Sequence, residues 1–349
     1  MPIKPETIKQ ILVVRTDRIG DVLLNVPAIR ALKETFKARI TLLAHRELKT
    51  LFEAIPEVDE VIAYDEERCQ SSLVERWRFL QLVRRRHFGL AVILNPSRQM
   101  HILAFAAGIP CRLGYHRKWG FLLTHSIADK KYEGQKHEVE YNLDLVRAIG
   151  ADTQDLRITL GRLAEEEAYV AQLCQKYALS PAATLVAIAP NTSNPAKCWP
   201  KEYFAQLIDR LIGEGGVKVA VIGAPQEHSA VIRLLAMTKQ LPINLCGKLN
   251  LRQLAAFLAR AQLLIANDSG PVHLAAAVDT PAIVIFGRNI PGVGPRRWGP
   301  WGKGHTVLHK DPGCSPCLDR ACADNFKCLR LITPEEVFAT AQMKLKDRR

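Results

Sequence analysis

Asp21 is the side chain of this sequence best suited to proton transfer. It lies in the segment RTDRIGDV, residues 15–22, with Arg15, Asp17 and Arg18 close by, where a predicted strand is followed by a predicted helix. As a general base it would take a proton from a hydroxyl nucleophile. As a structural residue it would only cap the helix, an effect worth about 0.3–1 kcal/mol. The helix terminus and the arginines are expected to lower its pKa, and desolvation by a bound substrate would have to offset them.

The segment NDSGPVHLAAA, residues 267–277, predicts a site for a phosphate or diphosphate. Ser269 and Gly270 supply backbone N–H groups where a helix begins after a strand, and such helix termini bind anions. His273 lies on the first turn, where it would donate to a phosphate or would only be packed. Asp268 would be repelled by a phosphate, so we expect it to hold a ribose hydroxyl or to order the loop.

The segment APNTSNPAKCWP, residues 189–200, offers one cation and two hydroxyl groups after another predicted strand. Lys197 would neutralise a phosphate as a point charge, or would be an ordinary solvated loop lysine. Thr192 and Ser193 supply the two hydroxyl groups.

Two more segments follow strands of the same half of the chain. Glu227, in GAPQEH at residues 223–228, would accept hydrogen bonds from a ribose diol or would cap a helix. Leu249, in LCGKLN at residues 245–250, would lie against a nucleotide base. The agreement of these segments is a stronger indication of a nucleotide site than any one of them.

The elements that must position these residues alternate between strand and helix, which predicts parallel sheets covered by helices. The alternation restarts after residue 180, so we predict two open α/β units with a linker at Ser180 and Pro181. Ligands of such sheets bind beyond the carboxyl ends of the strands, and two facing units would form a cleft. The predicted strands are residues 11–15, 39–43, 58–64, 90–94, 185–189, 218–222, 243–246, 263–266 and 282–286. The predicted helices are residues 20–36, 71–87, 165–177, 201–213, 227–239, 251–260, 270–278 and 333–346.

Composition and motifs exclude several classes of protein. The 349 residues contain 48 Lys and Arg against 35 Asp and Glu, a net charge of +13 that points to an acidic partner. Gly20 stands alone where a dinucleotide-binding dehydrogenase has three glycines, and the chain contains no P-loop motif. We find no signal peptide and no apolar run of about 18 residues, so we expect a cytosolic protein.

The positive charge is concentrated between Arg68 and Lys118, where ten basic residues face one acidic residue, Glu75. Nucleic-acid binding is disfavoured because the segment has no interleaved aromatic or base-reading motif. We expect part of it to contact anionic acceptor sugars and lipid phosphates at a membrane surface, whereas residues 84–86 would be a solvated helix face. The best candidates are Arg98, Arg112 and Arg117.

Four of the nine cysteines form the pattern C-x2-C-x4-C-x5-C, at Cys314, Cys317, Cys322 and Cys328. Clustered thiolates suggest a zinc site or an iron–sulfur cluster. Zinc ribbons usually separate their two cysteine pairs by a dozen or more residues, so a reduced loop that packs locally is the simpler interpretation.

The motifs together resemble glycosyltransferase family 9, the ADP-heptose:lipopolysaccharide heptosyltransferases, over nearly the whole chain. The most specific are GDV at residues 20–22, K-x-W-P at 197–200 and D-S-G-P-x-H-L-A-A-A from Asp268. The family commonly has threonine at the position of Ser269, and the serine keeps the hydroxyl. The pattern C-S-P-C-L-x-R-x-C at 314–322 is similar to members resembling the second heptosyltransferase.

The resemblance implies a GT-B fold with two Rossmann-like, doubly wound domains that face each other across a cleft. Residues 1–165 would bind the acceptor, completed by the C-terminal helix 333–349, and residues 180–332 would bind the nucleotide sugar. It implies inverting transfer of L-glycero-D-manno-heptose from ADP-heptose to the lipopolysaccharide inner core. No cofactor and no catalytic metal are implied. The protein would work in the cytoplasm, peripherally associated with the inner membrane.

The resemblance also implies roles for single residues. Asp21 matches the catalytic base, and Arg18 lies in an acceptor-side loop whose sequence departs from some members. The donor phosphates and their loop correspond to Lys197, Asp268, Ser269, Gly270 and His273, and the nucleotide side to Thr192, Ser193, Glu227 and Leu249.

Two alternatives remain open. Another GT-B nucleotide-sugar enzyme, with a different donor or an epimerase activity, would use a similar fold. A non-catalytic interaction protein would use the cysteine cluster as a metal-bound module and would not depend on Asp21.

Overall fold

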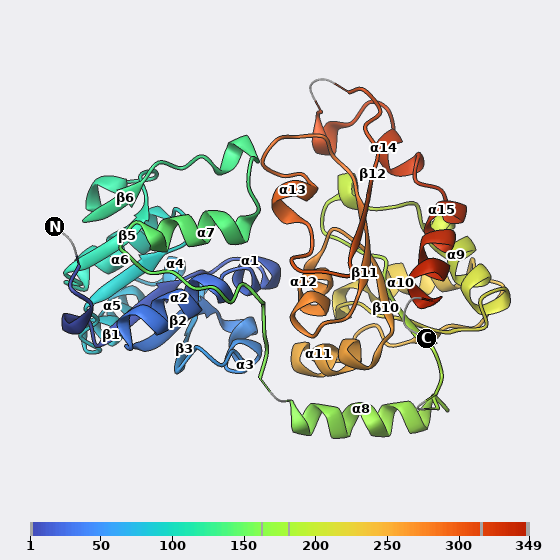
Figure 1. Ribbon diagram of the computed structural model, residues 1–349, viewed down its shortest axis with the longest axis horizontal. Coiled ribbons are helices and arrows are strands. Elements are labelled where there is room, and N and C mark those ends of the chain that lie inside the picture. The colour runs from blue at the N-terminus through green and yellow to red at the C-terminus, as the bar shows by residue number, and fades with distance from the viewer. Residues whose placement is uncertain (1–2, 162, 181, 315–316, 347–349) are drawn as a thin grey trace. The chain divides into compact units, whose positions relative to one another are not determined.

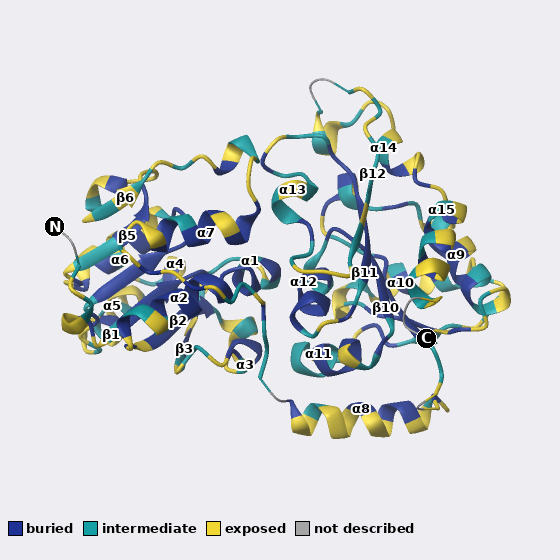
Figure 2. Cartoon of the chain, viewed as in Figure 1, coloured by how far each residue is buried: buried dark blue, intermediate teal, exposed yellow. Residues whose placement is uncertain are grey.

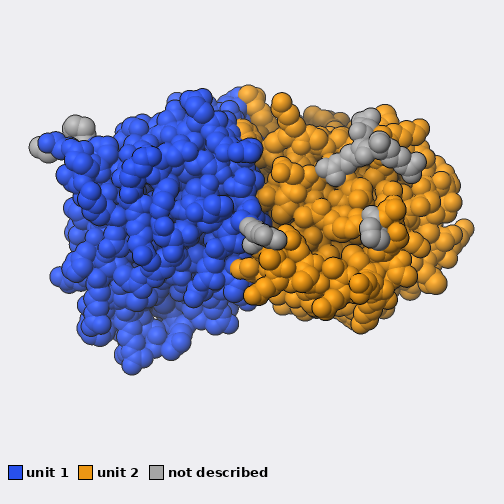
Figure 3. Space-filling model, turned by 60° about the horizontal axis from the view of Figure 1, so that its bottom comes forward, with its two compact units in different colours: residues 1–161 blue, residues 162–349 orange. Residues whose placement is uncertain are grey.

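The computed structural model describes residues 3–161, 163–180, 182–314 and 317–346. The chain divides into two compact units, Met1–Gly161 and Arg162–Arg349 (Figure 3). Each unit contains one six-stranded sheet, and every strand pair in both sheets is parallel. The predicted α/β class with two open sheets is therefore confirmed.

The first sheet has the strand order β3-β2-β1-β4-β5-β6 (Figure 1). The order reverses beside β1, and this switch point is where open α/β sheets bind ligands. Its strands are β1 Gln10–Val14, β2 Arg39–His45, β3 Glu60–Tyr64, β4 Leu90–Ile93, β5 Cys111–Tyr115 and β6 His125–Ile127. Its helices are α1 Ile19–Leu23, α2 Val26–Phe36, α3 Lys49–Phe52, α4 Glu66–Ser71, α5 Leu73–Arg84, α6 Arg98–Ala106 and α7 Glu138–Arg147.

The second sheet has the order β12-β11-β10-β7-β8-β9, with its switch point beside β7. Its strands are β7 Leu185–Ala189, β8 Lys218–Val221, β9 Ile243–Asn244, β10 Leu263–Asn267, β11 Ala282–Phe286 and β12 Thr306–His309. Its longer helices are α8 Ala164–Lys176, α9 Lys201–Gly213, α10 His228–Leu235, α11 Leu251–Arg260, α12 Gly270–Ala277 and α15 Pro334–Lys346. The short helices are α13 Pro295–Trp298 and α14 Lys327–Arg330.

Burial explains why these segments form strands. Every residue of β7, β10 and β11 is buried, and the three sequences are almost wholly apolar. Helices on both faces of a parallel sheet leave no solvated face, so its central strands are continuous apolar runs. Helix α8 instead alternates buried and exposed residues along its length (Figure 2).

The structure differs from the predicted elements in several places, and helices α3, α4, α6, α7, α13 and α14 were not predicted. The predicted helix 20–36 is two helices, because α1 ends at Leu23 and a new helix begins with Pro27 in its first turn. Strands β5, β6 and β12 were not predicted. Polar side chains interrupt the apolar pattern in all three strands. Strand β5 lies in the basic segment, and β6 follows it.

The predicted linker was placed too late in the sequence. Helix α8 belongs to the second unit, where it contacts α11. The Arg252 guanidinium lies 2.6 Å from the Glu166 carboxylate across that contact. The boundary at Gly161 and Arg162 therefore precedes α8, and Ser180 lies inside the second unit.

The prediction that the C-terminal helix completes the first domain is wrong for its described residues. Val337, Phe338 and Ala341 of α15 are buried in the core of the second unit, together with Trp199 of the loop before α9. The guanidinium of Arg210, in α9, lies 4.3 Å from the centre of the Phe338 ring. Apolar burial against α9 thus fixes α15 in the second unit. Residues 347–349 of the prediction lie outside the described residues.

None of the helices in the described part of the chain has the length and apolar character needed to cross a membrane.

Candidate active site

Asp21 lies in α1, directly beyond the carboxyl end of β1 and therefore at the switch point of the first sheet. Its Oδ2 accepts a hydrogen bond from the Arg18 backbone N–H at 3.2 Å, which caps the helix. Its Oδ1 accepts one from Arg15 Nη2 at 3.1 Å. The side chain keeps 19% of its surface exposed, so a reacting hydroxyl can reach it. The capping and catalytic interpretations are compatible, because each can use a different lone pair.

Burial raises the pKa of Asp21 above the ordinary aspartate value, against the opposing effect of the Arg15 guanidinium. The carboxylates of Asp17 and Glu138 raise it further. The Arg15 guanidinium and the capping N–H of Arg18 do lower the pKa, as expected, but burial in the folded protein outweighs them before any substrate binds. Removal from water costs an ionised carboxylate more than one shared arginine returns. A raised pKa makes Asp21 a stronger proton acceptor.

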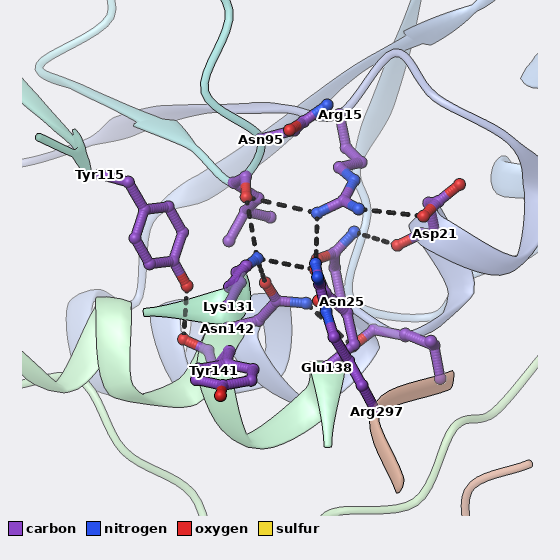
Figure 4. Close-up of polar contacts among 12 residues, drawn as sticks. Arg15, Asp21, Asn25, Asn95, Tyr115, Lys131, Glu138, Tyr141, Asn142 and Arg297 are labelled. Atoms are coloured by element: carbon purple, nitrogen blue, oxygen red, sulfur yellow. Dashed lines mark hydrogen bonds and ion pairs between the residues drawn. The ribbon is translucent and has the colours of Figure 1, made fainter. Parts of the chain in front are cut away.

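A buried polar network holds Arg15 beside Asp21 (Figure 4). Arg15 Nη1 donates to Glu138 Oε1 at 3.1 Å, and Lys131 Nζ donates to the same oxygen at 2.7 Å. Lys131 also donates to Asn142 Oδ1 at 3.0 Å. Arg15, Lys131 and Glu138 are all buried. Arg15 Nε also lies 2.8 Å from Asp17 Oδ2, so Asp21 is one of three carboxylates that share the Arg15 charge.

Asn25 fixes the backbone at Asp21. Its Nδ2 donates to the Asp21 carbonyl at 2.7 Å, and the whole residue is buried. The sequence analysis did not identify Asn25, Lys131 or Glu138. Lys131 and Glu138 lie in a polar stretch that reads as ordinary surface, so no local signal distinguishes them.

A pocket of about 490 Å³ opens at the carboxyl edge of the first sheet. Its polar lining includes Arg15, Asp17, Asn95, Arg98 and Lys118. Asp17 accepts from Asn95 Nδ2 at 2.7 Å, which ties the loop after β1 to the loop after β4. The pocket lies at the first turn of α6, where Arg98 is the first helical residue, so it suits an anionic ligand.

The four predicted acceptor arginines have different environments. Arg98 lines the 490 Å³ pocket, and Arg18 is exposed at the start of α1. Arg117 lines a neighbouring pocket of about 610 Å³ and lies 3.1 Å from the Asp129 carboxylate. Arg112 lies near the start of β5, at the amino edge of the sheet, opposite Ala91 of β4. Arg112 is not among the residues that line either pocket.

The Arg112 guanidinium has structural partners at the amino edge. It donates to the carbonyls of Leu122 and Ile109 and lies 5.4 Å from the centre of the Phe105 ring. These contacts hold the ends of β5 in place. They also use donors of the Arg112 guanidinium in hydrogen bonds to backbone carbonyls.

In the second unit, the loops that carry Lys197 and Asp268 meet. Lys197 Nζ lies 2.6 Å from Asp268 Oδ2, and both side chains are mostly buried. The Asn267 side chain joins the same loops by donating to the Pro190 carbonyl at 2.6 Å and accepting from the Trp199 N–H at 3.0 Å. Asp268 therefore orders the loop and orients a cation, which supports one of its two predicted roles.

Arg288 is a further cation at this position that the sequence analysis missed. Its Nη2 lies 3.3 Å from Asp268 Oδ2, and its Nε lies 3.9 Å from Asp319. Asp319 also accepts from Asn194 Nδ2 at 3.1 Å. Arg288 comes two residues after β11, so the strand-end rule that identified Lys197 and Asp268 would have found it.

The backbone at Arg288 is strained and tightly packed. Its φ is 67°, in the left-handed region, which costs most residues roughly 1–2 kcal/mol. The preceding Gly287 has no room for a Cβ, which would lie 2.2 Å from the Ala196 carbonyl oxygen. The loop after β11 is thus pressed against the loop that carries Lys197. Strain of this kind is common where a side chain must be held for function.

Helix α12 begins where the sequence analysis placed it. Ser269 is its N-cap residue, and the Ser269 hydroxyl donates to the Asn267 carbonyl at 3.0 Å. Gly270 is the first helical residue, and His273 is buried within the first turns. The N-terminus of α12 follows Asp268 directly in the chain. Its N–H groups therefore lie near Lys197 and Arg288, the two cations that contact Asp268.

The predicted nucleotide-side residues are less closely connected. Glu227 Oε2 accepts from the Ala224 N–H at 2.8 Å, so its capping role is present. Leu249 is half-buried and directly precedes Asn250, the N-cap residue of α11. Thr192 is half-buried and Ser193 is exposed in the loop before Lys197. Thr192 and Ser193 follow β7, and Glu227 follows β8, all beyond carboxyl ends.

The four clustered cysteines line one small cavity of about 20 Å³, next to Arg288 and Asp319. All four are free thiols. Burial and the Asp324 carboxylate raise the pKa of the Cys314 thiol. In the part of the chain that the structure describes, no group of three or more His, Cys, Asp or Glu side chains could hold a metal ion. The loop that carries these cysteines also supplies Asp319.

Comparisons with known proteins cover most of the chain. The chain is 28% identical over 296 residues to lipopolysaccharide heptosyltransferase 2 of Salmonella typhimurium, covering 82% of this chain and 85% of that protein. The structure is similar to that of E. coli ADP-heptose lipopolysaccharide heptosyltransferase II, with a TM-score of 0.80 and 25% identity over 97% and 100% of the two chains.

Two further solved structures share the fold. The glycosyl transferase family 9 protein of Veillonella parvula superimposes with a TM-score of 0.86 at 23% identity, over 99% of each chain. E. coli heptosyltransferase WaaC, solved with ADP-2-deoxy-2-fluoro heptose, gives a TM-score of 0.68 at 20% identity over 96% and 99% of the two chains. The sequence pattern of glycosyltransferase family 9 (heptosyltransferase) matches residues 76–327. With this match and the two parallel-sheet units, the chain belongs to glycosyltransferase family 9, the heptosyltransferases.

Proposed function

We propose that this heptosyltransferase moves L-glycero-D-manno-heptose from ADP-heptose to the lipopolysaccharide inner core with inversion at the anomeric carbon. The observation that carries the proposal is Asp21, an accessible carboxylate of raised pKa at the switch point of the first sheet. An inverting transfer needs one general base and no covalent intermediate. The names of the relatives support the donor and the acceptor class.

In this mechanism Asp21 takes the proton from the acceptor hydroxyl as that oxygen attacks the anomeric carbon. The bond to the ADP oxygen breaks on the opposite face of the sugar. Arg15 keeps the Asp21 carboxylate in one orientation through the 3.1 Å hydrogen bond. After proton transfer, the buried network around Glu138 still neutralises Arg15, so the site tolerates a protonated Asp21.

Charge develops on the diphosphate as ADP departs, and the second unit supplies the groups to stabilise it. Lys197 and Arg288 are held ready on Asp268, and the N-terminus of α12 follows in the chain. Because these groups are already oriented by protein contacts, little reorganisation accompanies the reaction. We assign Thr192, Ser193, Glu227 and Leu249 to the nucleoside, and His273 with Ser269 and Gly270 to the phosphates.

The acceptor is proposed to bind in the 490 Å³ pocket of the first unit. Arg98, Lys118 and the first turn of α6 suit the carboxylate or phosphate groups of a core sugar. Arg18 and Arg117 are assigned to the same acceptor side. The protein would work in the cytoplasm as a peripheral protein of the inner membrane.

Turnover of ADP-heptose with defined truncated lipopolysaccharide acceptors tests the proposal. We expect ADP release coupled to a heptose added to the acceptor, with an anomeric configuration opposite to that of the donor by NMR. Retention of configuration would contradict the single-base mechanism. Turnover with UDP- or GDP-sugars, but not with ADP-heptose, would favour a different GT-B enzyme.

A further inference from the structure

The outer helical layer of the first unit carries a concentration of exposed apolar side chains. Helices α5 and α6 cover the same face of the sheet, because Val83 of α5 and Met100 of α6 pack in one core cluster. The short 3-10 helix η3, Gly120–Leu122, contacts α6. Eight of the seventeen large apolar side chains found exposed in the described chain lie in this layer: Leu73, Val74, Trp77, Leu82, Ile102, Phe105, Trp119 and Phe121. Such concentration marks a binding surface rather than ordinary scatter.

Five of these residues belong to two segments that follow β3 and β5, respectively. Helix α4 begins directly after the carboxyl end of β3, and its Glu66 lines the 490 Å³ pocket. Helix α5 follows α4 and carries Leu73, Val74 and Trp77 in its first two turns. Trp119 and Phe121 follow the end of β5. We call these five residues the docking face. Leu73, Trp77 and Phe121 are exposed by 78%, 61% and 71%.

The docking face borders the 490 Å³ pocket. The Arg98 guanidinium lies 5.4 Å from the centre of the Trp119 ring, and the Trp119 and Phe121 rings are 5.8 Å apart. Arg98 and Lys118 both line the pocket. One arginine therefore belongs to the pocket and also supports an aromatic side chain of the docking face.

The fold holds the loop of Trp119 in place at an energetic cost. Lys118 and Trp119 adopt φ values of 48° and 70°, a left-handed region that bulky residues rarely occupy. The His101 ring Nδ1 lies 2.9 Å from the Lys118 carbonyl oxygen and ties the loop to α6. Packing within the unit thus holds Trp119 in an exposed position despite the strain in its backbone.

The charge around the docking face is mostly positive, although Glu75 of α5 lies within it and pairs with Arg68 and Arg78. Residues 76–128 contain nine Lys and Arg and not one Asp or Glu. Arg68 and Arg78 add exposed positive charge at the start of α5. Exposed aromatic and aliphatic residues surrounded by basic ones fit the interface of an anionic bilayer, where rings lie among headgroups and basic side chains meet lipid phosphates.

We propose that the docking face inserts into the interfacial region of an anionic phospholipid bilayer and so brings the 490 Å³ pocket to the membrane surface. The lipid-borne acceptor then reaches the pocket without leaving the bilayer. Only the identity of that acceptor rests on the proposed function. Docking itself is measured without sugar nucleotide, so the two can fail separately.

Vesicle flotation with the full-length protein tests the proposal. One set of vesicles contains phosphatidylethanolamine without phosphatidylglycerol. The other contains about 30% phosphatidylglycerol in phosphatidylethanolamine. We expect binding to the anionic vesicles that weakens as salt is raised. The variant Leu73→Ser/Trp77→Ser/Phe121→Ser should lower the partition coefficient about tenfold or more, because three apolar side chains no longer enter the bilayer.

Charge is tested separately with Arg68→Gln/Arg78→Gln. Each basic side chain near an anionic surface contributes about fivefold to partitioning, so this variant should bind about 25-fold less than wild type. Matched controls in the second unit are Ile232→Ser/Leu241→Ser and Arg233→Gln/Lys239→Gln, all exposed positions. We expect each control to bind as wild type, and all variants to keep the wild-type Tm.

Several results would overturn the proposal. These are absence of wild-type binding to anionic vesicles, equal binding to uncharged vesicles, or equal loss in the control variants. A dimer in solution that the triple serine variant abolishes, without vesicle binding, would assign the face to a second copy of the chain. In the activity assay, the triple serine variant should keep its rate on a delipidated core oligosaccharide and lose about tenfold on acceptor embedded in vesicles. Equal rates on both acceptors would show that docking does not deliver the acceptor.

Discussion

Lys197 and Arg288 contact the same oxygen atom, Oδ2 of Asp268, at 2.6 and 3.3 Å. They come from loops after β7 and β11, on either side of β10, whose own loop carries Asp268. Asp319, whose carboxylate lies 3.9 Å from Arg288 Nε, is the second acid of this cluster, so two carboxylates orient the two cations. The strained φ of Arg288 and the close approach of Gly287 to Ala196 hold this arrangement before any substrate binds.

This relationship predicts a specific effect of Arg288→Gln on donor use. A charge-assisted hydrogen bond is worth about 1.5–3 kcal/mol, so we expect kcat/KM for ADP-heptose to fall about 10- to 100-fold. Steady-state kinetics at saturating acceptor measure it, and Arg288→Lys should recover part of the loss. Arg320→Gln, an exposed arginine of the neighbouring loop, is the matched control. A wild-type kcat/KM in Arg288→Gln would exclude a donor role.

Replacing the proposed base tests the chemistry directly. Asp21→Asn keeps an acceptor oxygen for the Arg18 N–H but cannot take a proton, so kcat should fall about 10²- to 10⁴-fold. ADP-heptose binding by calorimetry should not change, because the residues that we propose for donor binding lie in the second unit. The exposed Glu34, on α2, provides the control variant Glu34→Gln. Full activity of Asp21→Asn would favour the non-catalytic alternative.

The raised pKa of Asp21 predicts the acidic limb of the pH profile. Only the deprotonated carboxylate accepts a proton, so kcat/KM should fall as the pH drops through the pKa of Asp21. Because burial raises that pKa, the limb should lie above the ordinary aspartate value of about 3.9. A pH series with a heptosyl acceptor measures it. A limb that persists unchanged in the residual activity of Asp21→Asn would belong to another group.

The buried network predicts a large loss of stability in Glu138→Gln. The substitution leaves Arg15 and Lys131 buried without their shared carboxylate, and breaking a buried pair in this way costs about 3–5 kcal/mol. Urea unfolding measures the free energy of unfolding. Asp144→Asn breaks a partly exposed pair with Lys136 and should cost about 1 kcal/mol or less. Equal effects of the two substitutions would show that the network contributes no more than a surface pair.

Substitutions of Arg98 and of Arg112 should have different effects on the acceptor KM. Arg98→Gln should raise the acceptor KM about tenfold, because Arg98 lines the pocket, and should leave the donor KM unchanged. Arg112→Gln should lower the Tm and leave both KM values unchanged, because its donors bind backbone carbonyls. A raised acceptor KM in Arg112→Gln with an unchanged Tm would reverse this assignment.

The sequence alone determined the fold class and the position of most candidate residues along the chain. Strands such as β7, β10 and β11 are buried on both faces and therefore consist of continuous apolar runs. Such runs can be recognised in the sequence without a structure. Asp21, Lys197 and Asp268 could be found because each directly follows such a run, and parallel strands bring their carboxyl ends to one edge. The weaker strands β5, β6 and β12 escaped because polar side chains break their pattern.

Only the tertiary structure decided which of these residues meet, and with what charge. The pKa of Asp21 depends on its burial and on Glu138, which is distant in sequence, and no local pattern reports either. Arg112 carries the same charge as Arg98, yet the direction of β5 places it at the opposite edge. Helix α15 packs in the second unit because the apolar face formed by Trp199 and α9 covers it, a match between surfaces distant in sequence. Local spacing fixes elements and their ends, whereas burial and pairing depend on contacts between elements, which only the folded chain defines.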